Sequence, residues 1–583
     1  MFEAIFDTAF LIYKYIDMIK KTLSTLLYVV FSIATGYAQQ YDEERKIVNE
    51  FLNKQGISAD SSQLEMATAK PEYLLFNSRK LNLFVLVATK KYHPNLSNPI
   101  LAYGFEGGLS GKNDTYFYEL IDIYKHQLNY LYENRLKLKR NLLKSYRPKK
   151  KKVNPLLRNI AWGQGLPYNK IYFRHQTGEI DKEEHVVGCV PVAMTQIMKY
   201  HAHPQQAQGT YAYNIMDEAP LKQDFSKFSF NWNLMKDTYN PEDINSASST
   251  EVAQLMAAVG ISVAANFGRF STSAYCERIK MALTNFFGYS PSCTYIKNRN
   301  IIITNPFQRD TVPLLSSDSI LGLTYRELDE KRPLIVSNDN HAFVCDGYDG
   351  EFLHFNLGWN GYCNGFYRII IIPGMDKYPL LYNNMVIGIQ PDKHTTRVKK
   401  VELTEAGTLE SVLTDKEKMH LHALIISGEL NGKDMKLIRR MAGAIDNNNY
   451  FQWRGELCHL DLSQASFKGG KDLDNSYLTQ KTFNYYMQNN KIGDYQFSGC
   501  NNLKTCKLPS NLTEIRQRAF WGCHSLMYID LPESVSKVGY FAFGDTYLLK
   551  RVTSNNDNIE AINIFNENTC ILNKGIIKPT NQQ

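Results

Sequence analysis

The sequence predicts an α+β protein of several domains that ends in a repeat solenoid. Three observations lead to this prediction. Residues 39–146 alternate helical and β-type patterns, and residues 153–392 are rich in glycine, aromatic residues and short β-type runs around one clear helix. Residues 416–575 repeat at a fixed period. A chain of 583 residues has room for roughly three or four domains, so all three parts fit.

The composition excludes several classes of protein. Hydrophobic residues make up 44% of the chain and aromatic residues 12%, which is enough for large cores and rules out wholesale disorder. Ten cysteines are too few for a disulfide scaffold of this length. Beyond the N-terminal region, no apolar run reaches the ~18 residues that a membrane span needs.

The basic charge is concentrated in one stretch. Residues 135–152 carry ten Lys and Arg and no acidic residue, whereas the net charge of the whole chain is +8. A nucleic-acid-binding protein is expected to spread such charge over a folded face. We therefore expect no nucleic-acid partner, and we interpret the stretch as an exposed linker or a processing site.

The N-terminal residues have the pattern of a secretory signal. Within residues 18–38, two lysines precede an apolar run over 23–34, and small residues precede a cut after Ala38. We expect residues 1–38 to be a signal peptide, with Met18 as an alternative start, and the mature protein to be secreted or held at the cell surface or in the periplasm. A buried helix or a single membrane anchor is the other interpretation.

Residues 39–152 are predicted to form a small α+β unit that ends in the basic stretch. The spacing predicts helices over 41–57 and 115–146, and strands over 73–77, 83–89 and 99–105.

The C-terminal part has a repeat of 23 residues. Over residues 492–552, Phe497, Phe520 and Phe543 align at this period, and LxxLxL segments recur before it. A period of 20–29 residues is typical of a leucine-rich-repeat solenoid, here over 416–575. Polar residues 393–415 are predicted to be a linker. Cys500 and Cys523 share one repeat position, so we interpret them as inward-facing residues, not metal ligands.

Cys189 is the first candidate for catalysis. An apolar helical face begins at Val190, and Pro191 suits the first turn, which places Cys189 at a helix N-terminus. Backbone N–H groups there favour a thiolate, the nucleophile of cysteine hydrolases. The alternative is an inert, buried cysteine.

Two residues far downstream complete a possible triad. His341 begins a strand pattern, and Asn356 follows it; the order Cys, His, Asn is that of papain-type enzymes. In such a triad His takes the thiol proton and Asn holds the imidazole tautomer. Gln164, in WGQGLPYN, is a candidate donor to a developing oxyanion.

No metal or cofactor site is predicted. The sequence has no HExxH motif, no CxxC pair and no GxxxxGK loop. His201 and His203 follow a helix without a further ligand nearby, which favours a helix-end pair over a metal site.

These segments together resemble the streptopain family of papain-like cysteine peptidases. The motifs are PLLRNIAWGQGLPYN, HVVGCVPVAMTQIMKYH, NHAFVCDGYD and HFNLGWNGYCNGFYRI, all within residues 153–392. The resemblance implies a papain-like peptidase domain over 153–392, and it extends more weakly over 41–112, which look like the family's propeptide. The repeats are similar to surface-protein leucine-rich repeats of some bacterial members.

The resemblance also implies roles for single residues in a secreted zymogen. Cys189 would be the nucleophile, His341 the base and Gln164 part of the oxyanion hole, with Asn356 and Trp359 around the histidine.

The sequence departs from the family pattern at two positions. Asn340 stands where the family usually has Gly before the histidine, and Asn360 interrupts the family's Gly-Trp-Gly-Gly. Neither change removes a catalytic group, but a side chain at Asn340 is expected to crowd the cleft or alter specificity.

Three functions remain open at this point. The first is a cysteine endopeptidase that acts on proteins and peptides and binds a protein or cell-surface ligand through its repeats. The second is a surface adhesin with a silent peptidase domain. The third is a transglutaminase or amidase on the same scaffold.

Overall fold

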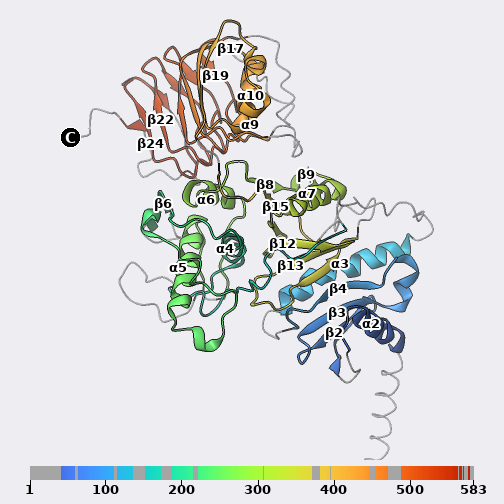
Figure 1. Cartoon of the computed structure of the whole chain (residues 1–583). Helices are drawn as coiled ribbons and strands as arrows, with labels where there is room; N and C mark the ends of the chain where they lie inside the picture. Colours follow the sequence, from blue (N-terminus) through green and yellow to red (C-terminus); the bar gives the residue numbers. More distant parts are fainter. Residues whose placement is uncertain are drawn as a thin grey trace, which may run out of the picture. The chain divides into compact units, whose positions relative to one another are not determined.

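The computed structural model describes residues 41–58, 63–109, 114–134, 151–171, 185–213, 221–268, 270–305, 308–370, 381–393, 396–445, 454–469, 488–561, 563–566, 569 and 576–577. Within these ranges the chain forms two compact units, one of residues 41–109 with 124–134, the other of residues 114–123 with 151–577 (Figure 1). The predicted signal peptide and most of the basic stretch lie outside the described residues. In the described part, no helix is long and apolar enough to cross a membrane.

The first unit is a four-stranded antiparallel sheet with helices. The strands lie in the order β1-β2-β3-β4, and every residue of β2 and β3 is buried, so both faces of the sheet are covered. The elements are α2 (Asp42–Lys54), β1 (Glu65–Ala69), β2 (Tyr73–Ser78), β3 (Leu83–Ala88), the 3-10 helix η2 (Lys90–Asn95), β4 (Ile100–Gly104) and the second half of α3 (Asp114–Glu133). The helices and strands predicted for this part are present, although only residues up to 134 of the second helix are described.

The second unit contains a central body, residues 151–393, with a helical part and an antiparallel sheet. The sheet has the order β14-β13-β12-β11-β15-β8, and β5 pairs with β12. The strands are β5 (Lys152–Val153), β8 (Thr294–Lys297), β11 (Leu334–Ser337), β12 (Ala342–Asp349), β13 (Phe352–Asn356), β14 (Gly365–Arg368) and β15 (Asn384–Ile387). Two hairpins lie outside this sheet, β6 (Thr210–Tyr213) with β7 (Leu221–Asp224), and β9 (Arg299–Asn305) with β10 (Gln308–Pro313).

Helices fill the rest of the central body. They are α4 (Cys189–His201), α5 (Ala247–Ser262), α6 (Arg278–Phe286) and α7 (Ser317–Asp329), with short 3-10 helices η4 (Phe225–Lys227) and η5 (Pro241–Asp243). The helix α4 is buried from Val190 to Met198 because its residues are apolar nearly all round, and it packs between α5 and the strand β12. This packing fixes the N-terminal end of α4 beside the start of β12.

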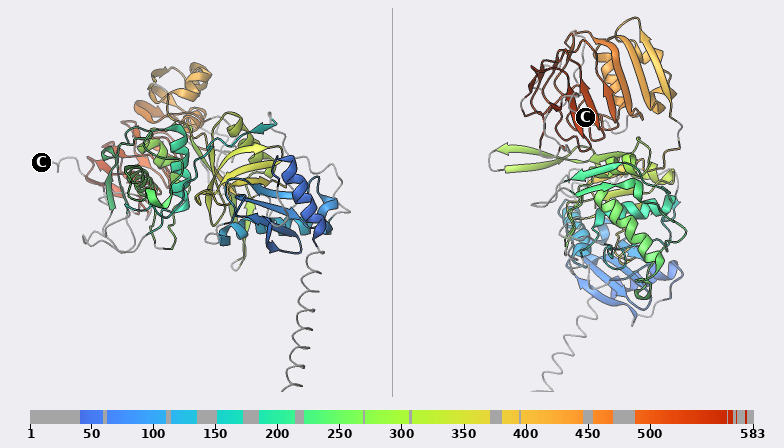
Figure 2. Two further views of the ribbon diagram at one scale, coloured as in Figure 1. Left: turned by 60° about the horizontal axis from the view of Figure 1, so that its bottom comes forward. Right: turned by 90° about the vertical axis from the view of Figure 1, so that its left-hand side faces the viewer.

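The solenoid, residues 396–577, contains two parallel sheets. One has the order β16-β17-β18-β20-β22-β24-β26, the other β19-β21-β23-β25, and Figure 2 shows these strands running side by side from orange to red. The elements are β16 (Val398–Leu403), α8 (Leu409–Val412), α9 (Asp415–His420), β17 (Ala423–Leu430), α10 (Gly432–Met441), β18 (His459–Phe467), β19 (Lys491–Ile492), β20 (Thr505–Lys507), β21 (Glu514–Ile515), β22 (Tyr528–Leu531), β23 (Lys537–Val538), β24 (Arg551–Ser554), β25 (Glu560–Ala561) and β26 (Ile576–Ile577).

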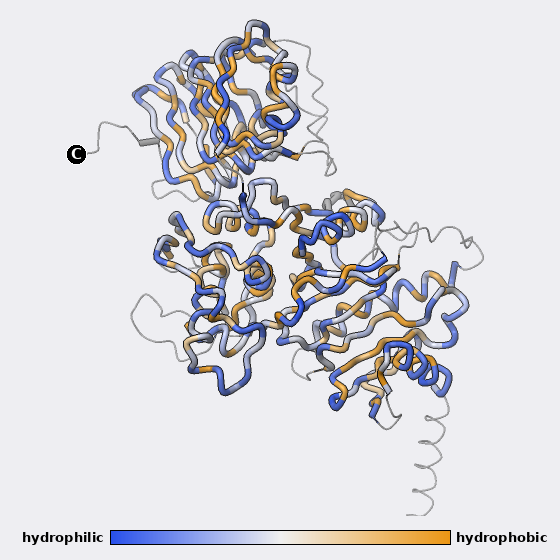
Figure 3. Tube along the Cα trace, viewed as in Figure 1, coloured by the Kyte–Doolittle hydropathy of each residue, from blue (hydrophilic) through white to orange (hydrophobic). Residues whose placement is uncertain are grey.

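The 23-residue period is visible as stacked side chains. Phe497 stacks on Phe520 and Phe520 on Phe543, with ring centroids 4.9 and 5.4 Å apart. Cys500 and Cys523 are fully buried in the same core. Hydrophobic and hydrophilic positions alternate along these coils in Figure 3, as a strand with one buried face requires.

The structure corrects the predicted linker. Residues 398–403, within the range 393–415, form β16, which pairs in parallel with β17 over Val398 to Leu403. The solenoid sheet therefore begins well before residue 416. The sequence VKKVEL hides this strand, because only Val401 and Leu403 are buried in it.

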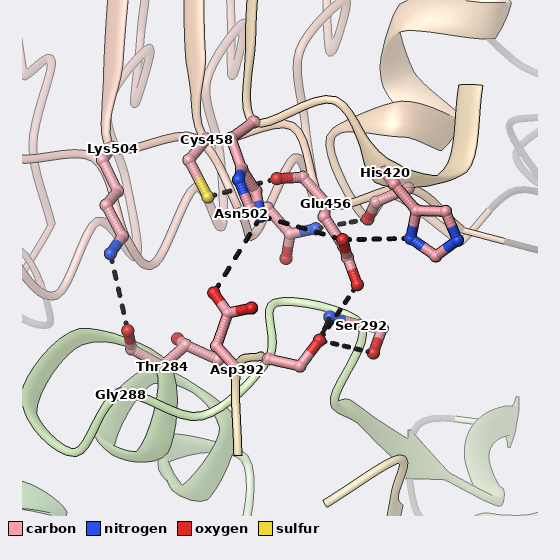
Figure 4. Close-up of polar contacts among 12 residues, drawn as sticks. Thr284, Gly288, Ser292, Asp392, His420, Glu456, Cys458, Asn502 and Lys504 are labelled. Atoms are coloured by element: carbon pink, nitrogen blue, oxygen red, sulfur yellow. Dashed lines mark hydrogen bonds and ion pairs between the residues drawn. The ribbon is translucent and has the colours of Figure 1, made fainter. Parts of the chain in front are cut away.

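The structure also shows that the solenoid does not have a fully separate core. Tyr547 and Leu548 are buried among the core residues of the central body. Polar contacts surround this junction, and Figure 4 shows Lys504 directed at Thr284 and Glu456 beside His420. The Glu456 carboxylate also accepts a hydrogen bond from the Ser290 hydroxyl, 3.1 Å away, in the central body.

Candidate active site

Cys189 is the first residue of α4, as the sequence predicted. The residue before it, Gly188, has a φ of +92°, a conformation that favours glycine. A Cβ at this position would lie 2.9 Å from the Thr272 side chain. The sharp turn at Gly188 therefore sets where the thiol points, and only glycine fits there.

The thiol of Cys189 lies at the start of β12. Its Sγ accepts a hydrogen bond from the backbone N–H of Ala342, the residue directly after His341. Cys189 and His341, which are far apart in the sequence, therefore come from two elements that meet at one point: the N-terminus of α4 and the N-terminus of β12.

A backbone carbonyl orients the His341 ring. The Nε2 atom lies 2.8 Å from the carbonyl oxygen of Leu357. Because a carbonyl oxygen only accepts, Nε2 carries the proton and donates it, and the lone pair is left on Nδ1. A neutral imidazole in this tautomer is ready to accept a proton at Nδ1.

The Asn356 side chain does not make the contact that a papain-type triad predicts. Its amide Nδ2 donates to the Ile160 carbonyl at 2.7 Å, and its Oδ1 accepts from the Gly358 N–H at 3.1 Å. Asn356 is buried and ties together two loops beside the site. The contact that orients His341 comes instead from the main-chain carbonyl of the next residue, Leu357.

Trp359 lies against His341, as the sequence resemblance implied. The two rings stack with centroids 4.8 Å apart and planes inclined by 30°. Trp359 is buried, so it shields one face of the imidazole from water. The neighbouring Asn360 donates its N–H to the Trp162 carbonyl, which holds this loop against the segment that carries Gln164.

Gln164 lies next to the loop that precedes Cys189. Its carbonyl accepts the N–H of Val187, two residues before the thiol, at 2.9 Å. This main-chain bond places Gln164 at the N-terminal end of α4, where the sequence predicted an oxyanion donor.

Burial favours the neutral forms of the thiol and the imidazole. Burial raises the pKa of the Cys189 thiol, although hydrogen bonds from the N–H groups of Ala342, Val190 and Cys189 itself act to lower it. Burial also lowers the pKa of His341 to about 4, against a smaller opposite effect of the Leu357 carbonyl. The helix N-terminus thus favours a thiolate as predicted, but desolvation is the larger effect in this form of the chain.

The first turns of α3 cover the imidazole side of the site. Tyr116 stacks against His341 with ring centroids 6.2 Å apart, and the Glu119 carboxylate accepts a hydrogen bond from the Asn340 amide at 3.1 Å. A small pocket lies here, lined by Tyr116, Glu119, Leu120, Asn338, Asn340, His341, Phe343 and Trp359. The unusual Asn340 therefore has a specific partner on the segment that covers the cleft.

Three features of the site have no signature in the sequence. The Leu357 carbonyl is main chain, and Asn364, whose Oδ1 accepts the Leu357 N–H at 2.9 Å, lies in the motif HFNLGWNGYCNGFYRI, where nothing marks it as part of the site. A second thiol, Cys276, lies close to Cys189; burial raises its pKa to about 12. Its surroundings, SAYCERIK, carry no spacing that predicts a site.

Comparison with known proteins identifies relatives of both parts of the chain. Residues 162–367 match the Peptidase C10 family, and residues 473–582 match the BspA type leucine rich repeat region in six copies. Streptopain from Streptococcus pyogenes is 30% identical over 305 residues, which make up 49% of this chain and 71% of streptopain.

Two further relatives are more distant. The thiol protease/hemagglutinin PrtT of Porphyromonas gingivalis is 27% identical over 408 residues, covering 64% of this chain and 44% of that protein. The structure of a prointerpain A fragment from Prevotella intermedia covers 57% of this chain and 99% of its own length, with 21% identity and a TM-score of 0.46. The predicted likeness to the streptopain family and to surface-type leucine-rich repeats is confirmed.

Proposed function

The chain belongs to the peptidase C10 family, and we propose that it is an exported cysteine endopeptidase made as a zymogen, with Cys189 as nucleophile and His341 as base. One observation carries this proposal. The Cys189 thiol lies at the backbone of Ala342, next to His341, while Nε2 of that histidine is occupied by the Leu357 carbonyl. Only Nδ1 is then left to take the thiol proton.

The proposed reaction is an acyl transfer. His341 Nδ1 removes the proton from Cys189 Sγ, and the thiolate attacks the carbonyl carbon of the scissile peptide bond. The Cys189 N–H and the Gln164 amide stabilise the oxyanion that forms. His341 then gives its proton to the leaving amine, and water hydrolyses the thioester so that the free thiol returns.

The zymogen state is supported by the cover over His341. Tyr116 and Glu119, from the first turns of α3, occupy the side of the imidazole that a substrate would approach. His341 is half-buried, and its lowered pKa, which keeps the imidazole neutral, agrees with a resting form. Removal of the segment before residue 151 would uncover the ring and return its pKa toward the usual value.

The repeats are proposed to bind a protein or cell-surface ligand. Tyr528 of β22 is exposed, and the cationic groups of Lys550 and Arg551 lie 5.7 and 5.4 Å from its ring centroid. An aromatic ring flanked by two cations suits a partner with acidic groups. An adhesin with a silent peptidase domain would use the same surface, but it would not need the ordered tautomer of His341.

A thiol-directed peptide electrophile tests activity and processing together. We expect it to modify Cys189 in the processed enzyme much faster than in the full chain, as measured by mass spectrometry with the N-terminus of each species sequenced. Cys506, buried in the solenoid, serves as the control thiol in the same digest. Labelling of Cys189 no faster than that of Cys506 would contradict an active peptidase.

A further inference from the structure

The solenoid is attached to the central body by side chains that enter the body's core. Tyr547 and Leu548, just before β24, are buried among core residues of the central body. His524, at the same position one repeat earlier, stacks on Tyr547 with ring centroids 4.3 Å apart. Docking of the solenoid therefore rests on buried apolar surface, not only on exposed ion pairs.

Tyr547 also holds the start of helix α6. Its hydroxyl donates a hydrogen bond to the Glu277 carboxylate, with 2.9 Å between the oxygens. The guanidinium of Arg278 lies 5.1 Å from the centroid of the Tyr547 ring. Hydrogen bonds to a charged acceptor are among the stronger ones in proteins, so Tyr547 fixes the Glu277–Arg278 segment.

This segment leads directly to the catalytic thiol. Cys276 precedes Glu277, and its thiol hydrogen-bonds to the Ser337 hydroxyl. Ser337 pairs with Ala342 across β11 and β12, and the Ala342 N–H is the donor to Cys189 Sγ. The thiols of Cys276 and Cys189 therefore contact Ser337 and Ala342, which pair with each other across β11 and β12.

The same chain segment also braces the loop before Cys189. The Val186 N–H donates to the Gly268 carbonyl at 3.1 Å, and the Thr272 hydroxyl donates to the Val186 carbonyl at 2.5 Å. The Thr272 side chain would lie only 2.9 Å from a Cβ on Gly188. Residues 268 and 270–277 thus contact both the loop before Cys189 and, through Cys276, the strand pair that holds Ala342. We call these residues the wall of the site, and Glu277 is its last residue.

We propose that Tyr547 is a positioning residue of the peptidase, through which the solenoid holds Glu277 and, with it, the wall that keeps Cys189 in place. The inference rests on the proposed function, because it concerns turnover at Cys189. It gives the repeats a part in hydrolysis of even short peptides, separate from any partner they bind.

Other hydrogen bonds also hold the solenoid to the central body. The Asn285 amide of α6 donates to the Ser525 hydroxyl at 3.0 Å, and both residues are buried. The Lys550 ammonium donates to the Thr210 hydroxyl at 2.9 Å. Because these contacts do not involve Tyr547, a variant lacking only its hydroxyl is expected to remain docked and folded.

Tyr547→Phe in the processed enzyme with its solenoid intact tests the proposal, since the substitution removes the hydroxyl and keeps the ring. We expect kcat for a short peptide to fall roughly three- to tenfold, with little change in KM or in the melting temperature. The alkylation rate of Cys189 should change by a similar factor, because the thiol environment changes. Tyr540→Phe, an exposed tyrosine in the same repeats, is the matched control and should match wild type.

A double-mutant cycle supplies a second readout. Glu277→Ala alone should cause a loss similar to that of Tyr547→Phe, and the double variant should be no worse than either single variant. A role that is merely structural would instead lower the melting temperature and leave kcat of the folded protein unchanged.

The outcomes separate this inference from the proposed function. If turnover depends on Cys189 but Tyr547→Phe and Glu277→Ala both equal wild type in kcat and in alkylation, the positioning role is wrong and the peptidase assignment stands. If turnover survives Cys189→Ala, both are overturned. Additive losses in the double-mutant cycle would also overturn the positioning role.

Discussion

His341 and the loop after β13 show how the site is held at the level of single residues. The imidazole contacts the Leu357 carbonyl, the Leu357 N–H donates to Asn364, and the Asn356 amide fixes the same loop to Ile160. The tautomer of the histidine thus depends on the position of one peptide group. Asn356 acts on that group indirectly, from the residue before it.

Asn356→Ala should therefore weaken the site without destroying it. The Ile160 carbonyl and the Gly358 N–H lose their side-chain partner, and each unsatisfied buried group costs about 1–3 kcal/mol. We expect the free energy of unfolding to fall by roughly 2–6 kcal/mol, the sum for the two groups. The loss in kcat should be much smaller than for His341→Ala. Urea unfolding and peptide turnover measure the two effects, and a kcat as low as that of His341→Ala would mean that Asn356 contacts the reacting groups.

Residue types allowed the reacting pair to be proposed, but not the groups that support it. Cys189 and His341 could be proposed because cysteine chemistry needs those side chains in that order, and the structure brings their elements together. The Leu357 carbonyl could not be found, because every residue has a carbonyl. Cys276 was missed because its position beside the site depends on a contact with Ser337 of β11, more than 60 residues away in the sequence, which leaves no local pattern.

At the scale of elements, the N-terminus of α4 is set by Gly188. Its φ of +92° and the Thr272 side chain leave no room for a Cβ. Gly188→Ala should strain this turn and displace Cys189, so we predict a loss of turnover of about tenfold or more with a stability loss of about 1–3 kcal/mol. Gly350→Ala is a useful control, since Gly350 also has a positive φ with open space around it and lies in the part of the chain that is kept after processing. Equal effects of the two changes on turnover would argue against a special role of Gly188.

The strand β5 narrows the expected processing site. The sequence predicts a cut between Arg147 and Asn154, but Lys152 and Val153 pair with β12, and Lys152 forms an ion pair with Asp349 at 2.9 Å. A paired strand resists proteolysis, so we expect the mature N-terminus between Arg147 and Lys152. In Cys189→Ala the precursor should accumulate unless another protease cuts it. A mature N-terminus mapped after Trp162 would show that β5 is not retained.

The secondary-structure elements could be predicted where a sequence period repeated several times along the chain. The 23-residue repeat predicted the parallel ladder, and Tyr528 pairs with Arg551, 23 residues later. The strand β16 was mistaken for a linker because its outward positions are lysines and a glutamate, which resemble exposed coil.

For the whole molecule, the junction between solenoid and central body changes the effect that we expect when the solenoid is removed by truncation. The sequence alone predicts that a cut near residue 400 leaves short-peptide hydrolysis close to intact. Such a cut falls inside β16 and removes Tyr547, Leu548 and Ser525. Tyr547 and Leu548 pack in the core of the central body, and the Ser525 hydroxyl accepts a hydrogen bond from Asn285 of α6. Contacts between segments more than 200 residues apart could not be derived from local patterns.

Three half-buried histidines make the whole fold sensitive to acid. Burial lowers the pKa of His201 and His341 to about 4 and that of His524 to about 3. The folded chain stays neutral at these sites while the unfolded chain takes up protons near pH 6.5, so stability is lost as the pH falls from about 6.5 toward 4. We predict a lower free energy of unfolding at pH 5 than at pH 7.

His524→Phe isolates one part of this effect, because phenylalanine keeps the stacking on Tyr547 but cannot be protonated. The difference in unfolding free energy between pH 7 and pH 5, measured with urea, should be smaller in this variant than in wild type. An unchanged difference would mean that His524 does not remain neutral when the chain folds.

The central claim is hydrolysis by the Cys189 thiol, and one measurement tests it most directly. Turnover of a quenched-fluorescent peptide is compared between wild type, Cys189→Ala and the control Cys506→Ala, all as processed, folded protein, with the Cys189→Ala precursor cut by added wild-type enzyme that is then removed. We predict that Cys506→Ala keeps the activity of wild type and that Cys189→Ala loses several orders of magnitude in kcat, as removal of a catalytic nucleophile typically does. Turnover by Cys189→Ala at a rate comparable to wild type would contradict the mechanism.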